Sequence, residues 1–414
     1  MQIEIQLSEI EEKIRNGYVL IDMRDEVSIQ YGMIPGAVPL RMENLLQNAG
    51  QFRQHPGVII YCTRGENSIY AAEELREENI PAYSLAGGYN AWLRERMQQE
   101  IDTNSVKKEE IERGIQKRWH KKLFSPFAKA VKTYDMLQDG DKIAVCISGG
   151  KDSMLMAKLF QELQKHKQKN FNLVFLVMDP GYSPENRRVI EHNAKLLGIP
   201  ITIFESDIFD SVLGIEKSPC YICARMRRGH LYSKARELGC NKIALGHHYD
   251  DVIETILMGM LYGGQMQSMM PKLHSTNFEG MELIRPMYLI REDDIKAWRD
   301  ANDLYFLQCA CKFTDTCSSC QEDGQSNSKR LETKKLIAEL KKTNPFIEGN
   351  IFKSVENVML DTMIAYKQDG IRHHFLDEYD KKRKIYSLAC MIRSIWIVLN
   401  VISEFRNLTV DTVF

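Results

Sequence analysis

Two short loops hold the residue types in this sequence that are best suited to chemistry. The first is SGGKDS at residues 148–153, where small residues leave backbone N–H groups accessible to an anion and Lys151 can neutralise its charge. The second is CTRGENS at residues 62–68, which begins with the lone Cys62. The N–H groups of a loop that leads into a helix, with the charge of Arg64, would stabilise a thiolate or persulfide there. The loops therefore predict a phosphate site and a reactive thiol.

The phosphate loop is not the common nucleotide-binding loop. The pattern GxxxxGK[ST] would require glycine where this chain has Val145, and serine or threonine where it has Asp152. The loop nevertheless follows an apolar run and precedes a helical pattern, which is the context of a phosphate site. The candidate phosphate-binding residues are Ser148, Gly149, Gly150, Lys151, Asp152 and Ser153.

Cysteine spacing predicts a metal or iron–sulfur site. Cys220 and Cys223 are separated by two residues at an expected helix start, where the helix dipole and the following arginines favour thiolates. Further cysteines crowd one later loop, so a zinc site built from two cysteine pairs is an open alternative to a cluster. These later residues are Cys309, Cys311, Cys317 and Cys320.

The run GHHYDD at residues 246–251 contains two histidines and two aspartates, which are residue types that bind metal ions. Neighbouring side chains in an extended run point to opposite faces, so we do not expect its histidines and aspartates all to bind one ion. Asp179 ends another apolar run, and two interpretations of it are open. It could face a nucleotide, or it could be a turn residue before the following Pro-Gly pair.

Apolar runs predict the strands that position these loops. In the first hundred residues they alternate with helical patterns, which predicts a small α/β domain over residues 1–98. Beyond residue 141 the runs lack polar alternation, which predicts a parallel, doubly wound sheet with helices on both faces. Ligands of such sheets bind at the carboxyl ends of strands, where SGGKDS lies. The expected strands are residues 18–24, 57–62, 82–88, 142–148, 172–179, 201–207, 242–247 and 283–288.

Residues 99–140 between these regions are polar and predict a basic helical linker. Nine Lys or Arg residues stand against three Glu between positions 107 and 132. Judged alone, a solvated connecting helix is favoured over a nucleic-acid contact. The residues whose spacing fits one apolar helix face are Ile111, Ile115, Trp119 and Leu123.

The length, net charge and cysteine content of the chain indicate how many domains it has, in which compartment it works and what its cysteines do. A chain of 414 residues exceeds what one core usually organises. A net charge of -1 provides no global attraction for nucleic acid, so local basic patches would have to bind it. The start, MQIEIQLSEIEEKI, lacks the pattern of a signal peptide, and we expect a cytoplasmic protein without a membrane partner. In that reducing compartment, ten cysteines indicate metal ligands or catalytic thiols rather than disulfides.

Several motifs together resemble one enzyme family. SGGKDS resembles the pyrophosphate loop of the PP-loop ATP pyrophosphatases, which have the adenine nucleotide alpha hydrolase-like fold. Further motifs resemble the tRNA 2-thiocytidine synthetase family, in order and at similar intervals, over roughly residues 115–375. These motifs are PCYICARMRRG (219–229), IALGHHYDDVIET (243–255), YGGQMQSMMPKL (262–273) and IRP (284–286).

The resemblance implies ATP-dependent replacement of a C2 oxygen by sulfur in an anticodon-loop cytidine of tRNA. It implies a [4Fe-4S] cluster held by Cys220, Cys223 and one later cysteine, with Cys309 as the first candidate and Cys317 or Cys320 as alternatives. It also implies an ATP site lined by the GHHYDD segment, with an aspartate helping to hold Mg²⁺. The residues assigned to that nucleotide site, with those of the phosphate loop, are Asp179, His247, His248 and Asp251.

The N-terminal region resembles a different family. The motifs IDMRDEVSIQYGMIPGAVPL (21–40), IYCTRGENSIYAAEELRE (60–77) and LAGGYNAW (85–92) resemble the rhodanese domain. The resemblance implies that residues 1–98 form a sulfur-carrier domain in which Cys62 bears a persulfide. Residues 141–375 would then be the PP-loop thiolation domain, and residues 376–414 a tail of unknown role that includes an apolar run broken by Arg393.

The two resemblances imply one reaction. Adenylation would turn a poor leaving oxygen into AMP, and sulfur from Cys62 would pass to the cluster at Cys220 and Cys223 or directly to the base. The implied partners are tRNA, whose target base must leave the stack, and a persulfide donor such as a cysteine desulfurase. A homodimer is compatible with this organisation. Thiolation of a uridine, or a zinc-bearing sulfur-relay adaptor without ATP chemistry, are the alternative functions.

Overall fold

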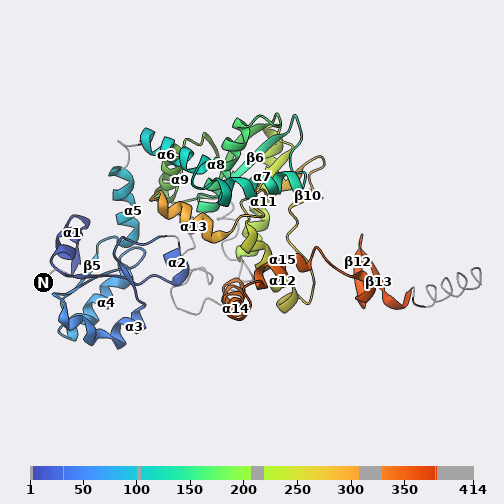
Figure 1. Ribbon diagram of the computed structural model, residues 1–414. Helices are drawn as coiled ribbons and strands as arrows, with labels where there is room; N and C mark the ends of the chain where they lie inside the picture. The colour runs from blue at the N-terminus through green and yellow to red at the C-terminus, as the bar shows by residue number, and fades with distance from the viewer. Residues whose placement is uncertain are drawn as a thin grey trace, which may run out of the picture. The chain divides into compact units, whose positions relative to one another are not determined.

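A computed structural model of the chain describes residues 3–30, 32–99, 104–206, 219–306, 329–377 and 379. The chain forms two compact units, Met1–Glu348 and Gly349–Phe414. The first unit contains two separate sheets, each with its own helices (Figure 1). The predicted fold class, an α/β region followed by a second α/β region with a mostly parallel sheet, therefore agrees with the structure.

The N-terminal sheet is parallel, with strand order β1-β5-β4-β2-β3. The buried residues of β4, Val58–Tyr61, are all apolar apart from the tyrosine hydroxyl, as expected for a central strand covered on both faces. The strands are β1 (Glu4–Ile5), β2 (Val19–Asp22), β3 (Val38–Pro39), β4 (Val58–Tyr61) and β5 (Ala82–Leu85). The helices are α1 (Leu7–Arg15), α2 (Glu26–Gln30), α3 (Met42–Gln47), the 3₁₀ helix Ala49–Gln54, α4 (Glu66–Glu77) and α5 (Gly88–Gln99).

The second sheet has the order β10-β11-β9-β6-β7-β8, and only its edge strand β10 is antiparallel. Strand order reverses beside β6, which places the end of β6 at the switch point where ligands of doubly wound sheets bind. The strands are β6 (Lys142–Ile147), β7 (Asn172–Asp179), β8 (Ile201–Glu205), β9 (Lys242–Ala244), β10 (Lys272–His274) and β11 (Glu282–Ile284). The helices are α8 (Lys151–Lys165), α9 (Pro184–Leu196), α11 (Pro219–Glu237), α12 (Tyr249–Gly263), α13 (Glu292–Ala301) and α14 (Lys329–Thr343).

The basic segment that precedes the second sheet is helical, as predicted. It forms α6 (Asn104–Gln116), a π-helical turn at His120–Phe124 and α7 (Ser125–Thr133). Its four apolar residues Ile111, Ile115, Trp119 and Leu123 are all buried. The segment also pairs with α8, because the Glu112 carboxylate lies 2.8 Å from the Lys158 ammonium group. One face of the segment is therefore part of the domain core rather than a solvated connection.

Side chains of α5 contact the second half of the first unit close to Tyr305. The Trp92 ring meets the Tyr305 ring edge-on at 4.9 Å, and Arg96 forms an ion pair with Asp303. The Tyr305 carbonyl in turn accepts a hydrogen bond of 2.9 Å from Asn193 on α9. The chain immediately before the cysteine-rich loop is thus held by both α/β regions.

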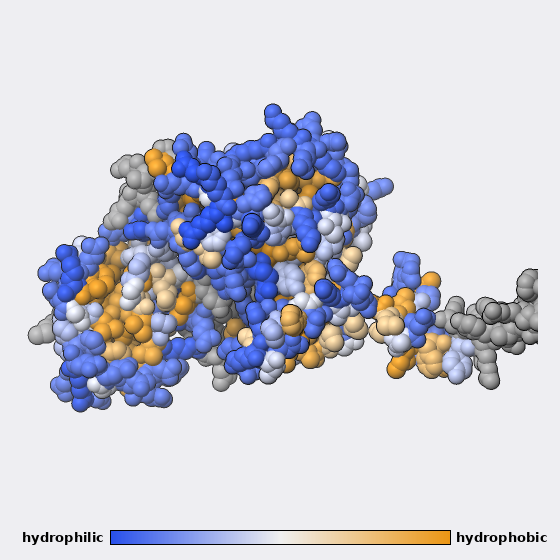
Figure 2. Space-filling view, viewed as in Figure 1, coloured by the Kyte–Doolittle hydropathy of each residue, from blue (hydrophilic) through white to orange (hydrophobic). Residues whose placement is uncertain are grey.

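The second unit is described from residue 349 to 377 and at residue 379. It contains the end of α15 (Ile347–Ser354), the 3₁₀ turns Leu360–Thr362 and Phe375–Asp377, and a hairpin of β12 (Ala365–Gln368) and β13 (Ile371–His374). Figure 2 shows apolar atoms on the surface of this hairpin, where Ile364 and Ile371 are exposed. Most of the predicted tail, residues 376–414, lies outside the described residues. Among the described helices, none is both long and apolar enough to cross a membrane.

Candidate functional site

The phosphate loop joins β6 to α8 in the conformation that its glycines permit. Gly149 has φ +86°, and a Cβ atom there would lie 2.6 Å from Cγ1 of Ile190, so a larger residue would clash. The Ser153 hydroxyl donates to the Gly150 carbonyl at 3.0 Å and accepts from the Ser148 N–H at 3.2 Å. The loop therefore closes on the first turn of α8 and presents a helix N-terminus to a ligand.

Lys151 is buried in this loop, at 3% exposure. Its ammonium nitrogen lies 3.1 Å from Oδ2 of Asp152 and 3.6 Å from Oε1 of Glu292. A buried ammonium group requires such counter-charges when no anionic ligand is present. The structure thus brings the predicted phosphate lysine to a carboxylate of α13 that sequence reasoning did not select.

The GHHYDD run changes conformation within its length. The expectation of an extended run is wrong beyond His248, because α12 begins at Tyr249. His248 and Asp251 form a reciprocal cap: the His248 N–H donates to the Asp251 carboxylate at 2.9 Å, and the Asp251 N–H donates to Nδ1 of His248 at 3.4 Å. This pairing satisfies the first turn of α12.

Three carboxylates lie within 4.0 Å of the ring of His248, which is 5% exposed, and that of Asp250 is 3.8 Å from Nδ1. Its Nε2 atom lies 3.6 Å from Oδ2 of Asp251 and 4.0 Å from Oδ1 of Asp152 in the phosphate loop. Burial alone would raise the pKa of Asp251, but His248 and Arg330 bring that pKa below its ordinary value. The two sequence motifs, SGGKDS and GHHYDD, therefore meet in space.

His247 lies on the other side of the same turn, next to Arg285. Its pKa is lowered to about 4, chiefly by burial, so the ring is neutral near pH 7. The Arg285 guanidinium donates from Nε to Nδ1 of His247 at 3.4 Å and from Nη1 to the Met270 carbonyl. These contacts join the IRP and GHHYDD motifs, as well as the loop before β10.

Asp179 sits at the carboxyl end of β7, beside β6. Its Oδ1 atom accepts hydrogen bonds from the N–H groups of Gly181 at 2.9 Å and Tyr182 at 2.6 Å, while Oδ2 lies 3.3 Å from Arg187. This is the geometry of a turn residue, the second of the two interpretations left open. A contact between Asp179 and a nucleotide stays a prediction.

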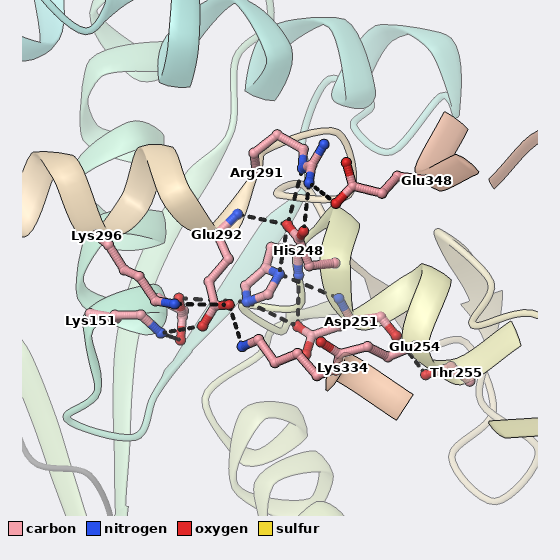
Figure 3. Close-up of polar contacts among 12 residues, drawn as sticks. Lys151, His248, Asp251, Glu254, Thr255, Arg291, Glu292, Lys296, Lys334 and Glu348 are labelled. Atoms are coloured by element: carbon pink, nitrogen blue, oxygen red, sulfur yellow. Dashed lines mark hydrogen bonds and ion pairs between the residues drawn. The ribbon is translucent and has the colours of Figure 1, made fainter. Parts of the chain in front are cut away.

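A network of ion pairs extends from Lys151 of the phosphate loop (Figure 3). The Glu292 carboxylate lies 2.5 Å from the ammonium group of Lys334 and 3.3 Å from that of Lys296. Arg291 contacts Asp250 at 3.0 Å and Glu348 at 2.6 Å. These partners were not among the predicted site residues, although the acidic run at residues 292–294 and the basic run at residues 329–342 are signals in the sequence.

The sequence of residues 329–342, KRLETKKLIAELKK, taken alone favours a solvated helix face for α14. The structure corrects this for one side of the helix: Arg330 lies 2.9 Å from Asp251 and 2.7 Å from Glu254, and Lys334 reaches Glu292. The physical reason is that the carboxylates of α12 and α13 need counter-charges once they are buried.

The Cys62 loop connects β4 to α4 in the N-terminal sheet. The Cys62 sulfur is buried and accepts a hydrogen bond of 3.1 Å from the Gly65 N–H, and the Ser68 hydroxyl lies 3.5 Å from it. A Cβ atom at Gly88 would come within 2.4 Å of the Cys62 carbonyl, so the facing turn requires glycine. The predicted donation of a loop N–H to the thiol is confirmed for Gly65. Arg64, whose charge was expected to act on the same thiol, has an exposed side chain.

A buried polar network fixes the strand end from which this loop leaves. The Asp22 carboxylate accepts hydrogen bonds from the Tyr61 hydroxyl at 2.7 Å and from Nη2 of Arg24 at 2.6 Å. The Arg24 guanidinium also lies 3.7 Å from the centre of the Tyr89 ring. Since Tyr61 directly precedes Cys62, these contacts fix the end of β4 and thereby the position of the Cys62 backbone.

The predicted cluster cysteines are only partly described. Helix α11 begins at Pro219, so the expected helix start at Cys220 and Cys223 is confirmed for the backbone. The candidates for a third ligand, Cys309, Cys311, Cys317 and Cys320, lie outside the described residues.

Two family models match the two α/β regions of the chain. Residues 117–311 match the family model of the PP-loop domain, and residues 6–95 match that of the Rhodanese-like domain. The solved structure of the U34-tRNA thiolase NcsA from Methanococcus maripaludis with its [4Fe-4S] cluster is 25% identical, with a TM-score of 0.44, and the match covers 59% of this chain and 80% of that one.

Two relatives have a higher sequence identity to this chain than NcsA has. A tRNA-cytidine(32) 2-sulfurtransferase of Anaeromyxobacter dehalogenans (strain 2CP-C) is 36% identical over 245 residues, which cover 58% of this chain and 81% of that protein. One of Ralstonia pickettii (strain 12J) is 36% identical over 244 residues, covering 58% of this chain and 73% of that protein. The chain therefore belongs to the tRNA-cytidine(32) 2-sulfurtransferase family.

Proposed function

We propose that this protein is an ATP-dependent tRNA thiolase that replaces the C2 oxygen of an anticodon-loop cytidine by sulfur carried on Cys62. The observation that carries the proposal is the closed phosphate loop, with buried Lys151 at the carboxyl end of β6, in the same chain as a thiol held by a loop N–H. Relatives named for cytidine thiolation support the choice of base.

The chemistry assigns one half of the reaction to each loop. The base oxygen attacks the α-phosphorus of ATP on the phosphate loop, the bond to the β-phosphate oxygen breaks, and pyrophosphate leaves. The terminal sulfur of a Cys62 persulfide then attacks C2, and AMP leaves with the oxygen. A thiol reductant supplies the two electrons that cleave the remaining sulfur–sulfur bond, which frees the thiolated base and returns Cys62 to its thiol form.

A magnesium ion fits beside the phosphate loop. Oδ1 of Asp152 is buried and accepts no hydrogen bond within the described part of the chain, and it shares His248 as a neighbour with Asp251. Carboxylate oxygens are the ligands that Mg²⁺ prefers, together with substrate phosphates. Asp152 and Asp251 would therefore hold the ion, which would neutralise charge on the phosphates.

The proposed activity predicts a defined set of products. Unmodified tRNA, ATP and a persulfide donor should yield 2-thiocytidine, with one AMP released for each thionucleoside formed. Nucleoside mass spectrometry and AMP quantification measure both. Thiouridine in place of thiocytidine would redirect the proposal to another tRNA position. The absence of tRNA-dependent AMP release would favour a sulfur-relay adaptor instead.

We assign the proposed iron–sulfur cluster to Cys220 and Cys223. Both residues belong to the first turn of α11 in the sequence, and a helix N-terminus favours thiolates. Cys309 is the first candidate for the third ligand, and a cluster held by three cysteines would offer an open iron to sulfur.

This assignment predicts the behaviour of a Cys220→Ala variant. Wild-type protein prepared anaerobically with iron and sulfide should be brown and contain both elements, and the variant should lose the colour and most of the iron. Visible absorption and metal analysis measure this independently of activity, with Cys240→Ala, a buried free thiol of the same α/β region, as the control substitution. Stoichiometric zinc without iron in the wild type would instead establish the zinc alternative.

A further inference from the structure

Glu292 lies where the phosphate loop, α13 and α14 meet. Its carboxylate contacts the ammonium groups of Lys151, Lys296 and Lys334, one from each of these elements (Figure 3). Burial alone would raise the pKa of Glu292, but Lys334 and Lys151 hold it well below its ordinary value. The carboxylate is therefore ionised at neutral pH and serves as a shared counter-charge for the lysines.

One face of helix α14 packs against α12 and α13 next to Glu292. Thr333 is fully buried and Ile337 is 5% exposed, while Arg330 and Lys334 reach carboxylates of α12 and α13 from the same side. These positions are three or four residues apart, as expected for one helix face. Lys342, on the same helix, is 70% exposed and pairs with Glu339. Lys334 is thus held in place by packing, rather than by its own ion pair alone.

Lys334 and Lys151 are neighbours because they share one carboxylate. The Lys151 ammonium group lies 3.6 Å from Oε1 of Glu292 and that of Lys334 lies 2.5 Å from Oε2, so both face one carboxylate, which suits an anion with two adjacent charged groups. A diphosphate carries more charge than the Glu292 carboxylate and accepts more hydrogen bonds. It can therefore recruit both lysines from Glu292 when it binds.

We propose that Lys334 is a second phosphate-binding lysine, which contacts with Lys151 the two phosphoryl groups that leave as pyrophosphate. Glu292 is the positioning residue that holds both ammonium groups before the nucleotide binds. The inference rests on the proposed ATP chemistry and adds to it a residue of α14, the helix that directly follows the cysteine-rich loop.

The test compares three probes, ATP, inorganic pyrophosphate and AMP, by calorimetry on the full chain. Lys334→Gln should weaken binding of ATP and pyrophosphate roughly 10- to 100-fold, as expected for loss of a charge-assisted contact, and should leave AMP binding unchanged. Lys334→Arg, which keeps the charge, should recover most of the affinity. Lys342→Gln is the matched control on the same helix and should bind all three probes like the wild type.

The outcomes separate this inference from the proposed function. Equal pyrophosphate affinity in Lys334→Gln and wild type would overturn the assignment of Lys334. So would a variant in which AMP binding falls as much as pyrophosphate binding, because that pattern indicates a purely structural role. If the wild type binds neither ATP nor pyrophosphate, the proposed function itself fails.

Discussion

Replacement of Lys151 by alanine is expected to abolish ATP-dependent thiolation while leaving sulfur loading of Cys62 intact. Lys151 is a buried cation within the phosphate loop, and its contacts with Asp152 and Glu292 hold the ammonium group at the N-terminus of α8. A preorganised cation there stabilises the charge that develops as pyrophosphate leaves. Loss of one such contact typically lowers the rate about 100- to 1,000-fold, and that is the minimum decrease we expect.

The measurement pairs AMP release in the presence of tRNA with persulfide detection on the N-terminal domain. Lys132→Ala, which changes an exposed lysine of α7, is the matched control and should thiolate at the wild-type rate. Lys151→Arg tests whether charge alone is sufficient. Its longer, planar head fits poorly at a buried point-charge site, so only partial recovery is expected. Wild-type product formation by Lys151→Ala would show that the nucleotide binds elsewhere.

Substitution of Cys62 by serine should remove thiolation from a persulfide donor while tRNA binding and ATP turnover persist. The Cys62 sulfur lies at the end of β4, within 3.1 Å of the Gly65 nitrogen, in a loop shaped to hold an anionic sulfur. A serine oxygen keeps the hydrogen bond but cannot carry a transferable sulfur atom. We expect a decrease of at least about 100-fold at limiting donor, since loss of a covalent carrier removes a whole step.

Free sulfide distinguishes a carrier from a binding module. Excess sulfide should restore thiolation by Cys62→Ser, because sulfide can attack the adenylated base directly, whereas it should not rescue Lys151→Ala. Cys240→Ala, which removes a buried thiol of the second α/β region, is the control and should keep donor-dependent activity. A Cys62→Ser enzyme that thiolates normally with limiting persulfide would make the N-terminal domain a binding module.

Residues 99–140 join the domain that carries Cys62 to the domain that carries the phosphate loop, and their length affects sulfur transfer from Cys62. A carrier joined to its acceptor by a short segment acts at an effective concentration that can reach the millimolar range. The length of residues 99–140 permits either a docked or a swinging carrier. The contacts of Trp92 and Arg96 with Tyr305 and Asp303 favour a docked arrangement in this structure.

Much of the site could be predicted from sequence because its elements are local. A glycine pair between an apolar strand and a helix specifies a phosphate loop through backbone freedom, and a lone cysteine at a similar junction specifies a thiol site. The apolar runs likewise predicted β2, β4, β5, β6, β7, β8, β9 and β11, since strands of a parallel sheet covered by helices are rich in apolar side chains. These features depend on neighbours within a few residues.

The counter-charges of the site were decided only by the tertiary structure. Lys334 and Glu292 are 42 residues apart, and Arg291 and Glu348 are 57 residues apart, so no local pattern pairs them. Residues 329–342 have the composition of a solvated helix. Which face of α14 is buried depends on the packing of Thr333 and Ile337 and on the counter-charges that the buried carboxylates of α12 and α13 require. The tertiary fold brings α12, α13 and α14 together beside the loop that follows β6. There the electrostatic cost of a buried charge is offset only if a residue of opposite charge lies next to it.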